Sequence, residues 1–391
     1  MSARADSSLR GREHALTEQT YVNPILDEDF PDPAIIHAPD GFYYAYATQT
    51  LRGDHWVNIQ VARSRDLIRW EQLGDALPDK PEWAQTTQDF WAPSVIFDGT
   101  TYFMYYSATP DVCQLHERGH ALAVATATDP AGPFTDMGMP LLLGAGFEYI
   151  DPMAFDDPLT GRRLLYWGSG FQPIKVQELS EDRMSFERGS NPVDLVWPNG
   201  KNGGFPRLVE ATWVIRHEDF FYLFYSGDNC CGPQAEYGVM VARSENATGP
   251  YETLEEARGV PHSLMLFKSE RWLAPGHNSV VTDKAGDLWM VYHAIDVNKP
   301  RQRQEDEINS RRILNRLDAR PVVLAPAEID HRPADRLADD ADAEVHRGFI
   351  IGDQMLIMAR SGDIILPLPI PPQEGRAFEP AHEESREDRS L

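Results

Sequence analysis

Three acidic residues stand out because each lies directly before an apolar, strand-like segment. Asp32 sits between two prolines, which favour an extended conformation for it, and Asp151 and Glu210 occupy similar places further along the chain. Acidic residues that lie together at one site can take different roles in acid–base catalysis. An ionised carboxylate deprotonates water, a protonated carboxyl group donates to a leaving oxygen, and a third negative charge keeps the pKa of the donor high. Hydrolysis of a glycosidic bond uses this chemistry.

The three acids fall at corresponding points of a repeat that is about 60 residues long. Each unit opens on a short apolar strand, passes a turn rich in Gly, Asp or Pro, and continues in an aromatic strand followed by two further strands. The five units begin at Asp32, Ala92, Asp151, Glu210 and His277. A radial repeat of about four strands per unit is typical of propeller blades. The sequence therefore predicts an all-β fold, a five-bladed β-propeller with four-stranded blades, plus a short C-terminal extension.

The first strand of each blade lines the central channel, so we expect the unit starts to meet at one channel mouth. A single acid before a strand needs no functional explanation, because acids are common in turns. Three at matching positions are different, since converging like charges repel one another and lose hydration. We interpret Asp32 as the base, Glu210 as the acid and Asp151 as the residue that raises the pKa of the acid.

Composition and charge limit the possible domain organisation and the possible binding partners. The chain has 391 residues and a net charge of -25, and it contains no apolar run long enough for a membrane helix, which argues against nucleic acid and membrane partners. We expect a flexible arm at residues 1–19, a propeller domain at residues 20–325 and a partly disordered C-terminal extension at residues 326–391. No signal peptide is visible, so the sequence predicts a cytoplasmic protein, or a secreted one if a signal has been removed.

The cysteines do not predict a disulfide framework. There are three of them, Cys113 and the adjacent pair Cys230 and Cys231. An odd count with two neighbours does not fit the spacing of a disulfide-stapled domain. We interpret the adjacent pair as packed thiols of a loop rather than as metal ligands.

Several motifs in combination resemble glycoside hydrolase family 43. The matching pieces are Asp32-Pro33, Trp91-Ala92-Pro93, Tyr149-Ile150-Asp151-Pro152, Glu210-Ala211 and Gly276-His277-Asn278-Ser279, the last followed by Tyr292-His293. The resemblance implies a five-bladed propeller and an inverting hydrolase. In it, Asp32 is the base, Asp151 the pKa modulator and Glu210 the acid.

The resemblance also implies substrate contacts and an ion. Trp91 at the channel mouth offers the flat apolar face that a sugar site needs, with a core position as the alternative, and Ser169 between two glycines is expected to border the same pocket. By the resemblance, His277 and Arg312 are expected to contact the sugar, with the neighbouring Arg311 as an alternative to Arg312. His277 matches a channel histidine that lies near calcium or another central ion in arabinan-acting members. One calcium ion at the propeller centre is therefore the expected cofactor, and no other is expected.

The expected substrate is plant cell-wall arabinan or a pentose oligosaccharide, cleaved at α-L-arabinofuranosyl linkages by an arabinofuranosidase or an endo-1,5-α-L-arabinanase. Three alternatives stay open: a β-xylosidase of the same family, a propeller that binds sugar without hydrolysing it, and a retaining transferase of the sucrose-acting kind. The sequence does not distinguish exo from endo action and does not fix the oligomeric state.

Overall fold

The computed structural model describes residues 21–111, 119–168, 170–198, 206–231 and 235–298, together with the backbone of strands at 322–326, 350–351 and 354–355. The regular structure within these ranges is almost entirely β. One α-helix, α1 (Leu254–Arg258), and one 3-10 helix, η1 (Glu82–Ala84), accompany the strands. Among the described residues, no helix is long and apolar enough to cross a membrane.

The architecture is a propeller of small antiparallel sheets, each built from strands that follow one another along the chain. The first sheet contains β1 (Ala34–His37), β2 (Tyr43–Ala47), β5 (Gln60–Ser64) and β6 (Trp70–Asp75), with the hairpin β3 (Thr50–Arg52) and β4 (His55–Val57) beside it. The second contains β7 (Trp91–Phe97), β8 (Tyr102–Ala108), β9 (Gly119–Ala127), β10 (Thr135–Asp136) and β11 (Leu142–Ala145). The third contains β12 (Met153–Asp156), β13 (Arg163–Trp167), β14 (Ile174–Glu178) and β15 (Val193–Val196).

The remaining sheets complete the set. The fourth contains β16 (Val209–His217), β17 (Phe220–Gly227), β18 (Gly238–Ser244), β19 (Glu252–Thr253) and β20 (Leu264–Leu266). The fifth contains β21 (Trp272–Thr282), β22 (Leu288–Asp296) and β23 (Val322–Pro326), and β24 (Ile350–Ile351) pairs with β25 (Gln354–Met355). The expectation of four strands in every blade is thus wrong for the second and fourth sheets. In each of them a fifth strand pairs with the third strand, β11 with β9 and β20 with β18.

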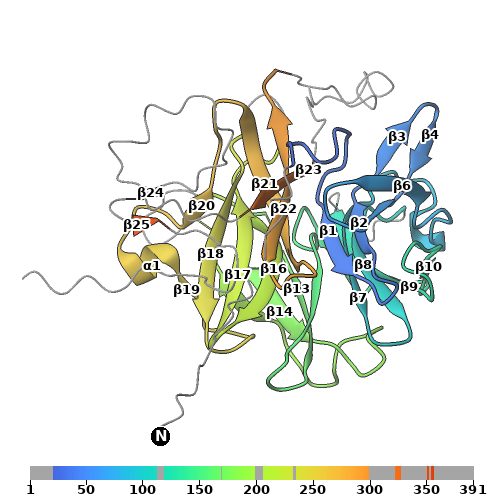
Figure 1. Cartoon of the computed structure of the whole chain (residues 1–391). Coiled ribbons are helices and arrows are strands. Elements are labelled where there is room, and N and C mark those ends of the chain that lie inside the picture. The colour runs from blue at the N-terminus through green and yellow to red at the C-terminus, as the bar shows by residue number, and fades with distance from the viewer. Residues whose placement is uncertain are drawn as a thin grey trace, which may run out of the picture.

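The first strands of the sheets contact one another in cyclic order. β1 touches β7, β7 touches β12, β12 touches β16, β16 touches β21, and β21 returns to β1. Figure 1 shows the sheets coloured in chain order, from blue for the first to orange for the fifth. The start and the end of the described propeller therefore lie side by side. The expected N-terminal arm and most of the expected C-terminal extension lie outside the described residues, so these two boundaries stay predictions.

Hydrophobic cores fill the spaces between neighbouring sheets, because alternate side chains of a strand point to opposite faces. In β8, Tyr102, Met104 and Tyr106 face the core shared with the first sheet. The intervening Phe103 and Tyr105 face the core shared with the third sheet. Strands buried on both faces are apolar throughout rather than alternating, which explains the aromatic runs of the sequence. These cores hold the first strands, and the residues at their starts, in place.

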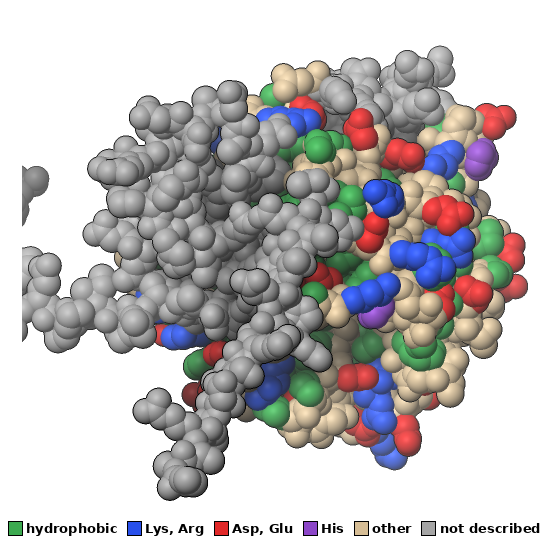
Figure 2. Space-filling view, in the orientation of Figure 1, with side chains coloured by type: hydrophobic (Ala, Val, Ile, Leu, Met, Phe, Trp, Pro, Cys, Tyr) green, Lys and Arg blue, Asp and Glu red, His purple; other side chains and the backbone are tan. Residues whose placement is uncertain are grey.

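The described surface carries charges of both signs. On the face shown in Figure 2, Lys and Arg side chains are interspersed with Asp and Glu. Ion pairs such as that of Arg63 with Glu71, 2.8 Å apart, connect neighbouring strands of one sheet. Exposed pairs of this kind contribute at most about 1 kcal/mol each, so the fold depends mainly on the cores between the sheets.

Candidate active site

A set of hydrogen bonds joins the start of each first strand to the preceding unit. At each start one residue has a left-handed backbone conformation, with φ between 47° and 60°, and its N–H donates to a side chain of the preceding unit. The pairs are Asp32 N with His293 Nδ1 (3.1 Å), Ala92 N with Thr48 Oγ1 (2.8 Å), Asp151 N with Ser107 Oγ (3.1 Å), Ala211 N with Asp151 Oδ2 (3.0 Å) and His277 N with Ser226 Oγ (2.9 Å). The left-handed conformation of a residue with a Cβ atom costs roughly 1–2 kcal/mol of conformational energy. The surrounding hydrogen bonds and packing must therefore maintain the conformation.

This geometry corrects two sequence-based expectations. Asp32 is not extended but left-handed, with φ of 60°. The start of the fourth unit is Ala211 rather than Glu210, because Ala211 has the left-handed φ and the N–H that donates backward. Glu210 thus lies one residue before the start, the same position that Trp91 holds in the second unit. A register shift follows both residues, so each belongs to an irregular strand entry.

Asp151 accepts the backward hydrogen bond because the usual acceptor is missing. The register of β12 against β13 places Gly168 where the other units have Thr48, Ser107, Ser226 or His293. Gly168 has φ of 135°, and a Cβ atom there would lie 3.1 Å from the Cα atom of Ile174. A side chain at this position would be strained, and the carboxylate of Asp151 bonds the N–H of Ala211 instead.

Asp32 lies in surroundings that keep it ionised. The Thr48 hydroxyl donates to its Oδ2 atom, and His277 Nδ1 lies 3.2 Å from its Oδ1 atom. Burial alone would raise the pKa of Asp32, but the positive charge and hydrogen bond of His277 outweigh burial and hold the pKa well below its usual value. Asp32 can therefore accept a proton across the ordinary pH range.

Glu210 has the opposite electrostatic character. Burial raises its pKa to about 8, and the negative charge of Asp151 adds to that rise, whereas a hydrogen bond from Tyr237 opposes it. The Tyr237 hydroxyl donates to Glu210 Oε1 at 2.8 Å. Glu210 is thus protonated at neutral pH and can donate a proton. The structure brings Asp32, Asp151 and Glu210 into one electrostatically linked group, and their catalytic roles stay a proposal.

His277 supplies the positive charge of this group. Burial would lower its pKa, but the charges of Asp32 and Asp151 raise it to about 9. Its Nδ1 atom lies 3.8 Å from Asp151 Oδ2 as well as close to Asp32. Among the described residues, no group of three or more His, Cys, Asp or Glu side chains is arranged to hold a metal ion. A central ion would bind only the neutral form of the His277 imidazole, and it would need further ligands of other kinds, such as water or carbonyl oxygens.

Trp91 lies in an aromatic stack near the carboxylates. Its ring contacts His120 at 4.5 Å and stacks on Phe147 at 6.3 Å between centroids. Its backbone pairs with Ser107, whose hydroxyl holds Asp151. Phe147 is 49% exposed and was not among the predicted site residues, although its place four residues before Asp151 was a usable signal.

Two predicted substrate contacts, Ser169 and Arg312, lie outside the described residues, as does the alternative Arg311. The interpretation of Cys230 and Cys231 as thiols is wrong, because a disulfide joins these adjacent residues. The Cys230 side chain packs against a small buried cluster that contains Tyr237.

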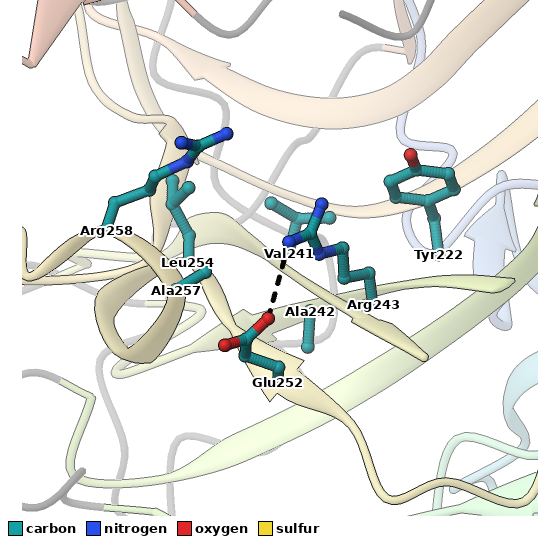
Figure 3. Close-up of a pocket in the computed structure, with 8 residues that line it drawn as sticks. All are labelled: Tyr222, Val241, Ala242, Arg243, Glu252, Leu254, Ala257 and Arg258. Atoms are coloured by element: carbon teal, nitrogen blue, oxygen red, sulfur yellow. Dashed lines mark hydrogen bonds and ion pairs between the residues drawn. The ribbon is translucent and has the colours of Figure 1, made fainter. Parts of the chain in front are cut away.

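A surface pocket lies where α1 covers β18 and β19, on the outer part of the fourth sheet (Figure 3). Arg243 and Glu252 form an ion pair across it, 3.4 Å apart, and Leu254 and Arg258 add to its wall. None of the predicted site residues lines this pocket, so the carboxylate group remains the candidate site.

Variants of Asp151 test its place in the hydrogen-bond ring. Asp151→Ala should lower the free energy of unfolding by about 1–3 kcal/mol, because the buried N–H of Ala211 loses its acceptor. Asp151→Asn keeps a side-chain oxygen and should lose much less. Both variants remove the negative charge beside Glu210, so urea unfolding of the pair isolates the hydrogen bond. Equal stability of the two variants would contradict the assignment.

Comparison with known proteins identifies the family. Residues 21–320 match the family described as Glycosyl hydrolases family 43. The probable arabinan endo-1,5-alpha-L-arabinosidase B of Aspergillus fumigatus is 29% identical over 300 residues, covering 67% of this chain and 77% of the relative. The extracellular exo-alpha-(1->5)-L-arabinofuranosidase of Cellvibrio japonicus is 26% identical over 278 residues, covering 63% of this chain and 77% of the relative.

A solved structure gives the same result. The crystal structure of a thermostable family-43 glycoside hydrolase has a TM-score of 0.60 and 26% identity, covering 80% of this chain and 94% of that chain. The family match spans more than half of the chain and includes all the residues of the carboxylate group. The chain therefore belongs to glycosyl hydrolases family 43.

Proposed function

We propose that this protein hydrolyses α-L-arabinofuranosyl linkages of arabinan or arabino-oligosaccharides with inversion of configuration. The observation that carries the proposal is the opposite protonation of two carboxyl groups in one partly buried cluster: Asp32 is held ionised and Glu210 is held protonated. The relatives named as arabinan-cleaving enzymes support the choice of substrate.

The residues divide the reaction as follows. Asp32 takes a proton from water while the water oxygen forms a bond to the anomeric carbon. The glycosidic C–O bond breaks with its electron pair on the leaving oxygen, and that oxygen takes the proton of Glu210. Burial and the negative charge of Asp151 keep Glu210 protonated before the step, and the imidazolium of His277 keeps Asp32 ionised. Solvent then returns both groups to their starting states.

Substrate contacts follow from the same arrangement. We assign the exposed face of the stack of Trp91, His120 and Phe147 to an apolar sugar surface. Ser169, His277 and Arg312 stay proposals as further contacts. We also propose that the propeller has five blades, with the three described strands of the fifth sheet as part of the last blade. The cyclic contacts of the first strands and the five backward hydrogen bonds support this number, and an experimental structure with β21 outside that ring would refute it.

The function is tested with a substrate panel. We expect linear 1,5-arabinan and 4-nitrophenyl α-L-arabinofuranoside to be hydrolysed, and proton NMR to detect a first product of inverted anomeric configuration. Sizing of the arabinan products separates exo from endo action. Asp32→Ala is the control preparation and should be inactive on every substrate, because each needs base-assisted water. Retention of configuration, or activity confined to aryl β-xylosides, would contradict the proposal.

The central calcium ion rests on the resemblance of His277 to the channel histidine of arabinan-acting members. Dialysis against a chelator should lower both activity and melting temperature, and added Ca²⁺ should restore them. His277→Ala should show the low values without responding to Ca²⁺. If chelation changes neither property, the ion has no role in this protein.

The pH dependence of kcat/KM reports the acid and the base of the free enzyme. Glu210 acts only when protonated, so activity should fall as pH rises through about 8. Asp32 acts only when ionised, so the acidic limb should lie below the usual range of an aspartate. Asp151→Asn should move the alkaline limb to lower pH, because Glu210 loses the nearby negative charge that raises its pKa. An alkaline limb that stays in place in Asp151→Asn would show that Asp151 does not act on Glu210.

A further inference from the structure

Tyr237 contacts the candidate acid directly, although no motif of the sequence pointed to it. It lies immediately before β18, and its side chain is buried, with only 1% of the residue exposed. Its hydroxyl donates to Oε1 of Glu210 at 2.8 Å. A buried tyrosine normally needs a partner for its hydroxyl, and here that partner is a group proposed to exchange a proton.

The orientation of the Tyr237 ring is fixed by a cross-strand pair of the fifth sheet. Gly276 of β21 pairs with His293 of β22. A Cβ atom on Gly276 would lie 2.0 Å from Cδ1 of Tyr237, so the glycine makes room for the ring. The imidazole of His293 lies parallel to the ring, 5.8 Å between centroids and 6° between planes. Residues of the fifth sheet therefore hold the hydroxyl of Tyr237 against Glu210.

The same pair connects Tyr237 to the base. His293 Nδ1 accepts the backbone N–H of Asp32 at 3.1 Å. The acid and the base are thus linked through two rings, from Glu210 to Tyr237, from Tyr237 to His293, and from His293 to Asp32. A displacement of Tyr237 would change the position of the Glu210 carboxyl relative to Asp32.

The hydrogen bond also distinguishes the two oxygens of the acid. An oxygen that accepts from Tyr237 behaves as the carbonyl oxygen of a protonated carboxyl group, which leaves the proton on the other oxygen, Oε2. When Glu210 donates, the Oε2–H bond breaks, its electron pair stays on the carboxylate, and the proton bonds to the leaving oxygen. The hydrogen bond from Tyr237 then becomes charge-assisted and stronger. It therefore stabilises the transition state more than the ground state.

We propose that Tyr237 is a positioning residue of the acid: it fixes the Glu210 carboxyl group, directs the acidic proton to Oε2 and stabilises the carboxylate that forms as the proton leaves. This inference rests on the proposed hydrolase function. Substrates that need protonation of a poor leaving group depend on this help, and substrates with a good leaving group do not.

The test compares Tyr237→Phe with the wild-type protein on two substrates. On linear arabino-oligosaccharides, kcat should fall about 10- to 100-fold, the range expected for one hydrogen bond to a charged group. On 4-nitrophenyl α-L-arabinofuranoside it should fall less than about threefold, and KM should change little on either substrate. The alkaline limb of the pH profile should move to higher pH, because the lost hydrogen bond favoured ionised Glu210. That direction is opposite to the one expected for Asp151→Asn.

Two further variants separate positioning from general stability. Tyr105→Phe removes another buried hydroxyl, which donates to the backbone oxygen of Arg183 at 2.8 Å between the second and third sheets. It should leave both substrates unaffected at a temperature where it is folded. Gly276→Ala keeps the hydroxyl but displaces the ring, and should reproduce the leaving-group dependence of Tyr237→Phe. An equal loss on both substrates in Tyr237→Phe, or no loss on either, would overturn the proposal.

One measurement works without turnover and separates this inference from the proposed function. Difference infrared spectroscopy with labelled glutamate, using Glu210→Gln to assign the band, follows ionisation of the Glu210 carboxyl in each protein. If the wild-type protein hydrolyses neither substrate, the proposed function fails. The contact of Tyr237 with Glu210 is then still supported by a change in the Glu210 band in Tyr237→Phe, and an unchanged band would overturn it.

Discussion

The backward hydrogen bond at the start of each first strand is the interaction on which the arrangement of the charged site depends. Each one requires a left-handed residue at the strand entry and an acceptor on the preceding unit. The left-handed residue lies at the strand entry, and its N–H bonds an acceptor of the preceding unit, so the hydrogen bond joins two neighbouring units. Because the side chain of the same residue faces the group of charges, one backbone requirement sets the position of Asp32, Asp151 and His277 together.

Much of this arrangement could be predicted from the sequence. The parts that could not be predicted were missed for physical reasons. Asp32 and Asp151 precede proline at a repeated position, so their places followed from the period. Glu210 was placed one residue out of register, because an irregular strand entry adds a residue that the pattern of apolar side chains does not reveal. Tyr237 is 27 residues from Glu210 in the chain. A buried tyrosine before an apolar strand looks the same in sequence whether its hydroxyl binds a catalytic group or a backbone oxygen.

The concentration of negative charge at the site is tolerated because each acid is stabilised differently. Asp32 has an imidazolium and a hydroxyl beside it, Asp151 has a backbone N–H, and Glu210 remains protonated at neutral pH. The cluster therefore holds fewer full negative charges than its composition suggests. The same arrangement separates the pKa values of Asp32 and Glu210, so the cost of bringing acids together is also the source of their division into base and acid.

Asp151 shows why fold and chemistry cannot be separated in this site. In the other units a serine, threonine or histidine side chain accepts the N–H at the start of the next unit. The residue at the start of such a unit therefore does not have to supply that acceptor. At Gly168 the backbone conformation and the nearby Ile174 disfavour a side chain, and Asp151 supplies the acceptor. The hydrogen bond fixes its carboxylate on the N–H of Ala211, the residue that follows Glu210. The negative charge that raises the pKa of the acid is consequently held at a constant distance by the same bond that joins two units of the propeller.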